Sequence, residues 1–387
     1  MKRIYNKYIV FLFLLVPIST AAQSVPFLGL WPDPAVLAMG GTSSVATTSA
    51  FSLYNNSAAS VWSEGKGAAQ ASYTLWQTGR TNHMSALSGF FKMHEKHAVS
   101  IGSRLFLHPE SALTNPLGII TGTYKPIDFS VDVGYAYKLA PKLSVGTTLY
   151  YIRSQMSPEH TSNAFACDVG LLYKQDWFSL GLTAKSLGTP IQYEEFSSAL
   201  PARVELGAGV FLPMADNHVL QANLQGSYML YYGGISAGAG LRYTFKEWIG
   251  ISTGFRYGTP DKEIPSFLSA GLDITWAGLK IQGTWLYGFY KGLLTNSFSV
   301  GLGWAYYAEK AIEYLGGKKV IFYYRVLWVA VVFIGSVVNL SMVWDLADAM
   351  NALMAIPNLI SLLLLTGVLV KETNKYLWND KLDAEAF

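Results

Sequence analysis

The chain alternates large apolar residues with small or polar ones over residues 67–306, and this period of two constrains its fold more than any other feature. In residues 128–139, for example, every second side chain is large and apolar, and those between are small, polar or charged. An amphipathic helix would repeat every 3.6 residues, so the pattern predicts β-strands. The same alternation recurs in residues 99–107, 143–151, 178–184, 203–212, 268–276, 279–289 and 297–306.

The second face of these strands favours a membrane barrel over a soluble β-sandwich. A sandwich would turn a polar face to water, whereas here the second face carries mainly Gly, Ser, Ala and Thr with few charges. Short turns such as residues 140–142 alternate with longer loops such as 155–163 and 188–202, as they do in outer-membrane barrels. We therefore predict an all-β transmembrane outer-membrane barrel over residues 67–306, with about 14 antiparallel strands.

The composition agrees with a barrel and excludes other classes of protein. Charged residues make up 14% of the chain, whereas soluble domains carry about 25%. Aromatic residues (11 Trp, 24 Tyr, 20 Phe) accompany 36 Gly, as in barrels with aromatic girdles and small lumen residues. A net charge of +3 without a basic cluster argues against a nucleic-acid partner. The single cysteine, Cys167, excludes a disulfide framework.

Two segments precede the predicted barrel. Residues 1–22 begin with basic residues, continue with a short apolar run and end in small residues, which predicts a cleaved signal peptide. The alternative, an uncleaved anchor, requires a longer apolar run. Residues 23–66 show no alternation and instead contain three recognisable sequences: Ala38-Met39-Gly40-Gly41, Val45-Ala46 and Asn55-Asn56-Ser57-Ala58.

This order of motifs, followed by a barrel pattern, resembles the PorV/PorQ family of outer-membrane proteins of the type IX secretion system. That family is itself similar to the FadL-like transporters of long-chain fatty acids. Its third motif contains Asn-Pro-Ala, whereas the segment 55–58 of this chain has no proline. The resemblance covers residues 23–306 and implies a role in protein secretion or cargo handling. It also implies other secretion components and secreted cargo as partners.

The resemblance further implies that residues 23–66 form a hatch inside the lumen, where a wide barrel would otherwise leave an open pore. A periplasmic linker folded against the barrel mouth is the alternative. Gly40 and Gly41 would allow backbone turns that other residues resist. The missing proline would have fixed φ in the usual hatch loop. The residues expected in the hatch or on the lumen wall are Met39, Gly40, Gly41, Asn55, Asn56, Ala58, Asp132, Arg203 and Glu205.

The sequence gives no positive sign of catalysis or metal binding. The segment His94-Glu95-Lys96-His97 is one residue shorter than the H-E-x-x-H zinc motif and falls at an expected hairpin turn, so we interpret it as a solvated turn. The six histidines are scattered among predicted loops, and none can be paired with a serine from the sequence. We therefore expect no enzyme activity and no cofactor.

Residues 307–387 have a different character. Residues 320–340 and 342–370 are apolar stretches, each long enough for a transmembrane helix, which needs about 20 residues. Lysines flank the pair and no Lys or Arg lies between Leu327 and Val370, so both ends are expected to face the cytoplasm. We predict two transmembrane α-helices forming a hairpin, which would favour an inner membrane.

Residues 303–378 closely resemble the C-terminal end of the alanine or glycine:cation symporter family. The matching sequences are residues 303–310, 343–348, 353–359 and 370–373. In that family, upstream helices supply the substrate and sodium sites, and here barrel strands precede Ala308, so we do not expect this segment to transport alone. The intramembrane or helix-breaking residues of the symporter-like segment are Trp344, Asp345, Asp348, Asn351, Pro357 and Asn358.

The two parts make conflicting demands on membrane targeting. A barrel precursor must cross the inner membrane, whereas long apolar helices would be retained there. Both families read nearly alike at residues 302–307, where the parts meet. Our hypothesis is a gene-level or assembly-level chimera at this point, and the alternative is a working protein of two membranes.

The sequence therefore leaves several functions open. The first is a PorV/PorQ-type barrel embedded in outer-membrane lipids. The second is a FadL-like channel for hydrophobic small molecules, which a lateral opening in the wall and an apolar pocket at the hatch would distinguish. The third is a fragment of a sodium:alanine symporter, and a barrel enzyme comes last.

Overall fold

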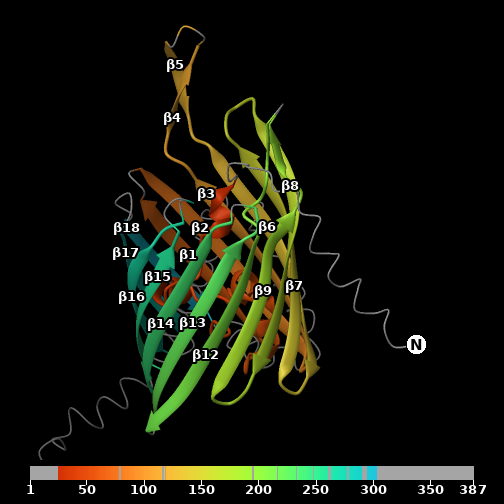
Figure 1. Ribbon diagram of the computed structural model, residues 1–387, viewed down its shortest axis with the longest axis vertical. Coiled ribbons are helices and arrows are strands. Elements are labelled where there is room, and N and C mark those ends of the chain that lie inside the picture. The colour runs from red at the N-terminus through yellow and green to blue at the C-terminus, as the bar shows by residue number, and fades with distance from the viewer. Residues whose placement is uncertain are drawn as a thin grey trace, which may run out of the picture. The chain divides into compact units, whose positions relative to one another are not determined.

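The computed structural model describes residues 25–302 except 78–79, 116, 118, 194–195, 216, 232, 247, 260–261, 263, 277–278 and 290–293. Fourteen antiparallel strands close into a barrel in which β1 pairs with β18, so the predicted 14-stranded barrel is confirmed (Figure 1). The wall consists of β1 Gly67–Gln77, β2 Thr81–His94, β3 His97–Leu107, β6 Ile127–Ala140, β7 Leu143–Gln155, β8 Thr161–Lys174, β9 Phe178–Gly188, β12 Arg203–Ala215, β13 His218–Met229, β14 Ile235–Phe245, β15 Ile249–Gly258, β16 Phe267–Trp276, β17 Leu279–Gly288 and β18 Leu294–Leu302.

The predicted signal peptide and the predicted C-terminal helices lie outside the described residues, as do residues 303–306, which were expected to continue the last strand. In the part of the chain that the structure describes, no helix has both the length and the apolar character needed to cross a membrane.

Alternate residues of each wall strand face opposite environments, as the sequence pattern predicts. On β6, Ser130 and Asp132 are fully buried in the lumen, whereas Val133 and Tyr135 are 49% and 42% exposed on the outer surface. An exposed apolar surface of this extent on a closed barrel is the band that contacts lipid. The period of two therefore determines which side chains meet the membrane and which fill the lumen.

The connections differ at the two ends of the barrel. Short turns join β2 to β3, β6 to β7 and β8 to β9 at the end where β1 begins and β18 finishes. Such short turns face the periplasm in outer-membrane barrels. The opposite end carries the hairpin of β4 (Ser111–Thr114) and β5 (Ile120–Tyr124), which projects from the barrel (Figure 1).

The long connection 188–202 is not the plain polar loop that the sequence predicted. It contains a second hairpin, of β10 (Ile191–Tyr193) and β11 (Phe196–Ser198). Ile191 is fully buried in an apolar cluster with Val25 and Phe27. Burial of this one apolar side chain accounts for the extra structure, because it draws the loop onto the N-terminal segment.

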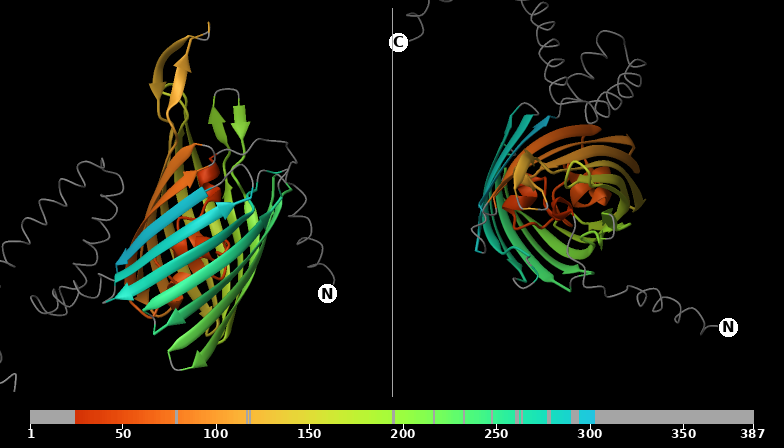
Figure 2. Two further views of the ribbon diagram at one scale, coloured as in Figure 1. Left: turned by 90° about the vertical axis from the view of Figure 1, so that its left-hand side faces the viewer. Right: turned by 90° about the horizontal axis from the view of Figure 1, so that it is seen from above.

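Residues 25–66 lie inside the ring of strands (Figure 2, right). This segment consists of short helical turns: η2 Pro26–Gly29, α1 Pro34–Ala38, α2 Ser52–Asn55 and η3 Ser57–Trp62. Helix α1 contacts β15 to β18, whereas η3 contacts β3 and β6 to β8. The segment therefore reaches from one side of the lumen to the other.

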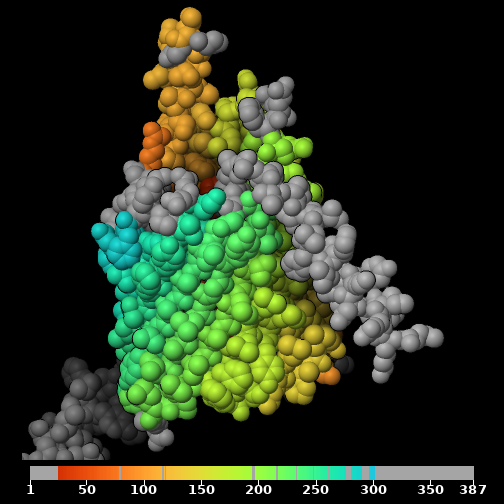
Figure 3. All heavy atoms as spheres, in the orientation of Figure 1, coloured from red at the N-terminus to blue at the C-terminus, as the bar shows by residue number. Residues whose placement is uncertain are grey.

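Besides register shifts close to three of the short turns, the described wall is irregular where β9 bulges against β8. The register shifts between Cys167 and Val169, and Ser186 adopts a positive φ of 55°. The Asp168 carboxylate stabilises the bulge, since it accepts hydrogen bonds from the Ser186 backbone N–H at 2.7 Å and the Tyr150 hydroxyl at 2.9 Å. Beyond this point the green strands β12 to β14 present a closed outer surface (Figure 3).

Candidate functional site

The hatch, residues 25–66, fits against glycines on the inner face of the wall. Gly40 and Gly41 have φ values of 68° and 75°, the left-handed region in which glycine is favoured. A Cβ atom on Gly254 would lie 2.5 Å from the Met39 carbonyl carbon and closer still to the Gly40 nitrogen. Small residues on the second face of the strands thus give the hatch backbone room to contact the wall.

Asn56 fastens the middle of the hatch. Its Oδ1 accepts a hydrogen bond from the Ala58 backbone N–H at 3.2 Å, which caps η3. Its Nδ2 donates to the carbonyls of Ser44 at 2.9 Å and Leu171 at 3.1 Å. Ser57, which follows, occupies the first position of η3, where proline would also be tolerated. The cap and the bond to the wall strand β8 hold this part of the hatch without the proline.

Replacing Asn56 with Ala should loosen the hatch. The substitution removes one cap and leaves two buried carbonyls with fewer donors, for which we expect a loss of about 2–4 kcal/mol in the free energy of unfolding. Urea unfolding in detergent micelles measures this loss of stability. Asn163→Ala, on the outer face of β8, is the control. Equal stability of the two variants would show that these hydrogen bonds do not hold the hatch.

A buried cluster of charges joins the hatch to β9 and β12. The carboxylate of Glu205 accepts hydrogen bonds from Arg203 Nε at 2.8 Å and from Ser43 Oγ in the hatch at 2.7 Å. Lys185 Nζ lies 3.5 Å from Glu205 and donates to the Tyr54 carbonyl at 2.8 Å. All three charged side chains are buried, so each depends on the others for its counter-charge.

Arg104 makes a second connection, to the strands β3 and β6, which lie farther along the wall beyond β8 and β7. Its Nη2 pairs with Asp132 Oδ1 at 2.6 Å, and its Nε donates to Ser130 Oγ at 3.0 Å. The guanidinium also lies 4.8 Å from the centre of the Tyr54 ring, within cation–π range. Arg104 therefore links β3, β6 and the hatch.

Arg256 on β15 holds the glycine turn of the hatch. Its guanidinium lies 4.6 Å from the centre of the Trp31 ring, and its Nη2 donates to Ser236 Oγ at 2.6 Å. Its Nη1 also donates weakly to the Gly40 carbonyl at 3.4 Å. A planar guanidinium can stack on an aromatic ring and donate in its own plane at once, which lysine cannot do.

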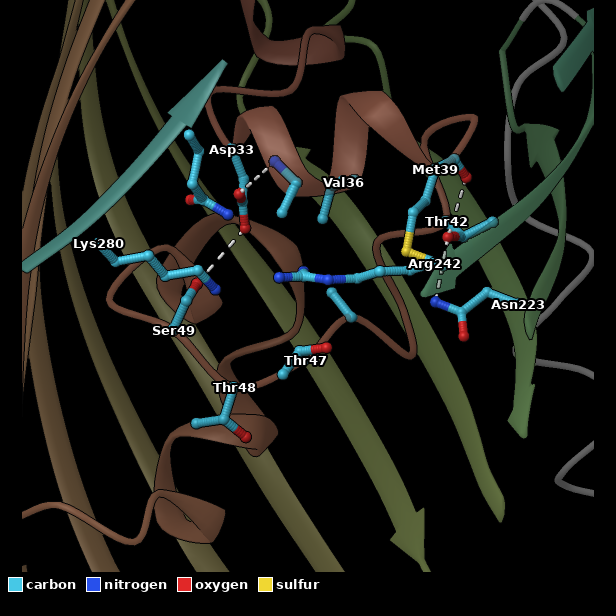
Figure 4. Close-up of a pocket in the computed structure, with 13 residues that line it drawn as sticks. Asp33, Val36, Met39, Thr42, Thr47, Thr48, Ser49, Asn223, Arg242 and Lys280 are labelled. Atoms are coloured by element: carbon cyan, nitrogen blue, oxygen red, sulfur yellow. Dashed lines mark hydrogen bonds between the residues drawn. The ribbon is translucent and has the colours of Figure 1, made fainter. Parts of the chain in front are cut away.

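Asp33 organises the interior of the hatch beside a small cavity of about 20 Å³, large enough for about one water molecule (Figure 4). It caps α1 by accepting from the Ala35 N–H at 3.0 Å, and it accepts from Asn55 Nδ2 at 2.7 Å. Burial raises the pKa of the Asp33 carboxyl, while the Asn55 hydrogen bond and the charge of Lys280 lower it. Arg242 and Lys280 point toward this cavity from the wall (Figure 4).

These contacts describe a barrel whose lumen is filled by its own N-terminal segment. Residues 17–230, more than half of the chain, match the family described as type IX secretion system protein PorV. The chain belongs to the PorV family. It is therefore an outer-membrane β-barrel of a secretion family rather than an enzyme.

Solved structures share the fold of this PorV-family barrel. The toluene transporter TbuX of Ralstonia pickettii aligns with a TM-score of 0.52 at 11% identity, over 70% of this chain and 97% of that one. The toluene transporter TodX of Pseudomonas putida aligns with a TM-score of 0.50 at 14% identity, over 70% and 96%. Identities this low establish the fold alone, which is the FadL-like barrel that the sequence resemblance predicts.

A second family matches the end of the chain. Residues 269–386 match the sodium:alanine symporter family. The sodium/alanine symporter AgcS of Methanococcus maripaludis is 52% identical over 85 residues, which are 22% of this chain and 19% of that protein. The probable sodium/glutamine symporter GlnT of Bacillus subtilis is 38% identical over 110 residues, 28% and 23% of the two chains. The chain thus spans about a fifth of the length of the curated relatives it matches.

The match to PorV ends at residue 230, and the symporter match begins before the barrel is complete. The symporter match begins at residue 269, on β16, but β16 to β18 pair with one another and close the barrel onto β1. The strands β16 to β18 are therefore part of the barrel wall. The symporter-like residues Trp344, Asp345, Asp348, Asn351, Pro357 and Asn358 lie outside the described residues.

The structure places all nine candidate hatch and lumen residues inside the barrel. Ala58 is fully buried, and its carbonyl accepts a hydrogen bond from Ser144 Oγ at 2.7 Å. Arg242 and Arg256 are lumen residues that the sequence analysis did not single out. Both could have been predicted as lumen residues from the sequence, because each lies an even number of positions from small inner residues of its own strand. These are Gly238 and Gly240 for Arg242, and Gly254 for Arg256.

Two segments resemble catalytic motifs, but the structure gives each of them a structural role. Residues 94–97 form the turn between β2 and β3, as predicted. Gly234-Ile235-Ser236-Ala237-Gly238 has the G-x-S-x-G spacing of a nucleophile elbow, a match that sequence reasoning missed. Ser236 lies on strand β14 rather than at a strand-to-helix turn, and its hydroxyl accepts a hydrogen bond from Arg256. This serine serves to hold the arginine.

Proposed function

We propose that this chain acts in type IX protein secretion as a closed barrel that handles cargo at the outer membrane without conducting through its own lumen. The observation that carries the proposal is the hatch, which buried charges tie to β12 at Glu205, to β3 at Arg104 and to β15 at Arg256. A lumen filled in this way leaves the outer rim and the projecting hairpin β4–β5 as the surfaces for macromolecules. Secreted cargo and other secretion components are the proposed partners, with outer-membrane lipids around the wall.

A secretion assay tests this proposal. Deleting the gene in its host should trap type IX cargo in the cells, and the full chain supplied from a plasmid should restore cargo to the medium. A chain that lacks the hairpin residues 110–124 should assemble in the outer membrane and fail to restore secretion. Normal cargo release from the deletion strain would contradict the proposal.

The alternative, a channel for hydrophobic small molecules, requires a lateral opening and an apolar pocket at the hatch. The small cavity at Asp33 is lined by charged and polar groups, including Arg242, Lys280 and Asn223. A larger cavity beside Trp62 has apolar walls at Leu172 and Phe211 but also contains the charged groups Lys174 and Glu64. The wall bulge at Ser186 is stabilised by Asp168 rather than left open. These observations favour secretion, and the channel remains a hypothesis that uptake of radiolabelled toluene into proteoliposomes would test.

We further propose the organisation of the whole chain. Residues 1–22 form a signal peptide, 23–66 the hatch, 67–306 the barrel and 307–387 a hairpin of two transmembrane helices. The helices would favour an inner membrane, so we propose that the two parts were joined as a chimera near residues 302–307. Support comes from the match to PorV at one end and to a symporter over only a fifth of its length at the other.

Mass spectrometry of separated inner and outer membranes tests the join. The tryptic peptide from Gly292 to Lys310 spans it. We expect peptides of β1 to β17 in the outer-membrane fraction and this peptide in neither fraction. Finding the peptide in the outer membrane would establish a genuine fusion and refute the chimera.

A further inference from the structure

Six lysines gather at the short-turn end of the barrel, in three pairs that face each other across neighbouring strands. In each pair one backbone N–H donates to the carbonyl of the other lysine. The pairs are Lys92 to Lys66 at 2.7 Å, Lys138 to Lys96 at 2.9 Å and Lys174 to Lys142 at 2.8 Å. Like charges placed opposite each other destabilise a sheet. Because this arrangement occurs three times, we expect an anionic group to bind here and offset the repulsion.

The turns that carry these lysines supply too few anions to balance them. The acidic residues in these turns are Glu64, Glu95 and Asp176, three against six lysines. Among the described residues, no ion pair involves any of the six lysines. The lysine array, as we call residues 66, 92, 96, 138, 142 and 174, therefore keeps an excess positive charge.

Three lysines of the array surround the point where the hatch leaves the lumen. Lys92 Nζ donates to the Ser63 carbonyl at 2.7 Å. Lys138 Nζ lies 4.0 Å from the centre of the Trp62 ring, and Lys174 Nζ lies 5.8 Å from it. Contact with hatch residues shows that these ammonium groups face the mouth of the barrel and not the membrane.

The outer surface at the same height is apolar. Met93, Leu139 and Trp177 lie next to these turns, and their side chains are 57%, 53% and 59% exposed. Such residues suit contact with lipid, whereas the charged groups are on the inner side. The anion that meets the lysine array is therefore expected to arrive from the water of the periplasm rather than from lipid headgroups.

A cavity of about 320 Å³ adjoins the array, a volume within the range of ligand pockets. Lys174 and Glu64 line it together with Trp62 and the apolar side chains of Leu172 and Phe211. The cavity thus offers an apolar and aromatic surface beside positive charge. A ligand that fits both features carries carboxylates and an apolar side chain.

We propose that the short-turn mouth of the barrel binds an acidic peptide segment of a periplasmic protein. Its carboxylates contact the lysine array, and one of its apolar side chains enters the cavity beside Trp62. The inference stands on the charges and the cavity and does not depend on the proposed secretion role. The periplasmic face is thus a second surface at which the chain contacts other proteins, in addition to the outer rim and the hairpin β4–β5.

Peptide binding to the full chain in neutral-detergent micelles tests the proposal. The probe is a fluorescein-labelled peptide of alternating Glu and Phe, and its matched control has Gln in place of every Glu. We expect the acidic peptide to bind, the Gln peptide not to bind, and added salt to weaken the acidic complex. The double variant Lys138→Gln/Lys174→Gln should bind roughly tenfold more weakly.

Lys246→Gln, in the turn after β14 at the same end of the barrel, is the matched control variant and should bind as the unmodified chain does. Heat-modifiable migration on gels confirms that each variant contains a folded barrel. Equal binding of the two peptides, or unchanged affinity in the double variant, would overturn the proposal. Loss of co-purifying phosphatidylglycerol from the double variant, with peptide affinity unchanged, would overturn it in favour of a lipid headgroup site.

Discussion

Replacing Gly254 with Val should expel the hatch from its seat and open the barrel. A side chain at this position would collide with the backbone of Met39 and Gly40, which cannot move aside as a flexible side chain can. We expect planar-bilayer conductance to rise roughly tenfold or more above that of the unmodified chain, because a wide barrel without a plug encloses an aqueous channel.

Gly226→Val provides the matched control for this experiment. Gly226 lies on β13 with its Cα facing outward, and a Cβ there would meet nothing within 4 Å. The control should insert, migrate as a folded barrel and stay closed. An equally closed Gly254→Val barrel, shown to be folded by the same gel assay, would mean that the hatch is not held at this wall.

Replacing Glu205 with Gln should destabilise the barrel by about 3–5 kcal/mol, since it leaves Arg203 and Lys185 buried without their counter-charge. It also weakens the acceptor for Ser43, which connects the hatch to β12. Urea unfolding in micelles measures the loss. Glu95→Gln, in the exposed turn after β2, is the control and should change stability little.

A second substitution separates charge imbalance from poor packing. If the cost of Glu205→Gln comes from an unpaired buried cation, adding Lys185→Met should recover part of the lost stability. Recovery of stability in the double variant is the expected result. A double variant that is less stable than both single variants would instead show that the shape of this cluster matters more than its charge.

The sequence predicted the barrel because the alternation of residues is a local property of each strand. In residues 128–139 the parity alone placed Asp132 in the lumen and Tyr135 on the membrane face, and the structure agrees. The same parity would have identified Arg242 and Arg256, because β14 and β15 alternate just as regularly.

Long-range partners could not be read from the sequence. The contact of Ser43 with Glu205 joins residues 162 positions apart, and it depends on how far the hatch enters the lumen. The hairpin β10–β11 was missed for a similar reason, because Ile191 is buried only once Val25 and Phe27 are in place. Strand pattern determines the faces of the wall, whereas tertiary packing determines which atoms meet across the lumen.

Hydrogen exchange of the full chain in micelles reports directly on whether residues 33–62 are packed inside the barrel. We expect peptides from these residues to exchange slowly, on the time scale of strand β6, and peptides from the projecting hairpin, residues 110–124, to exchange fast. If residues 33–62 exchanged as fast as that hairpin, the segment would be a linker outside the lumen, and a barrel filled by its own hatch would be contradicted.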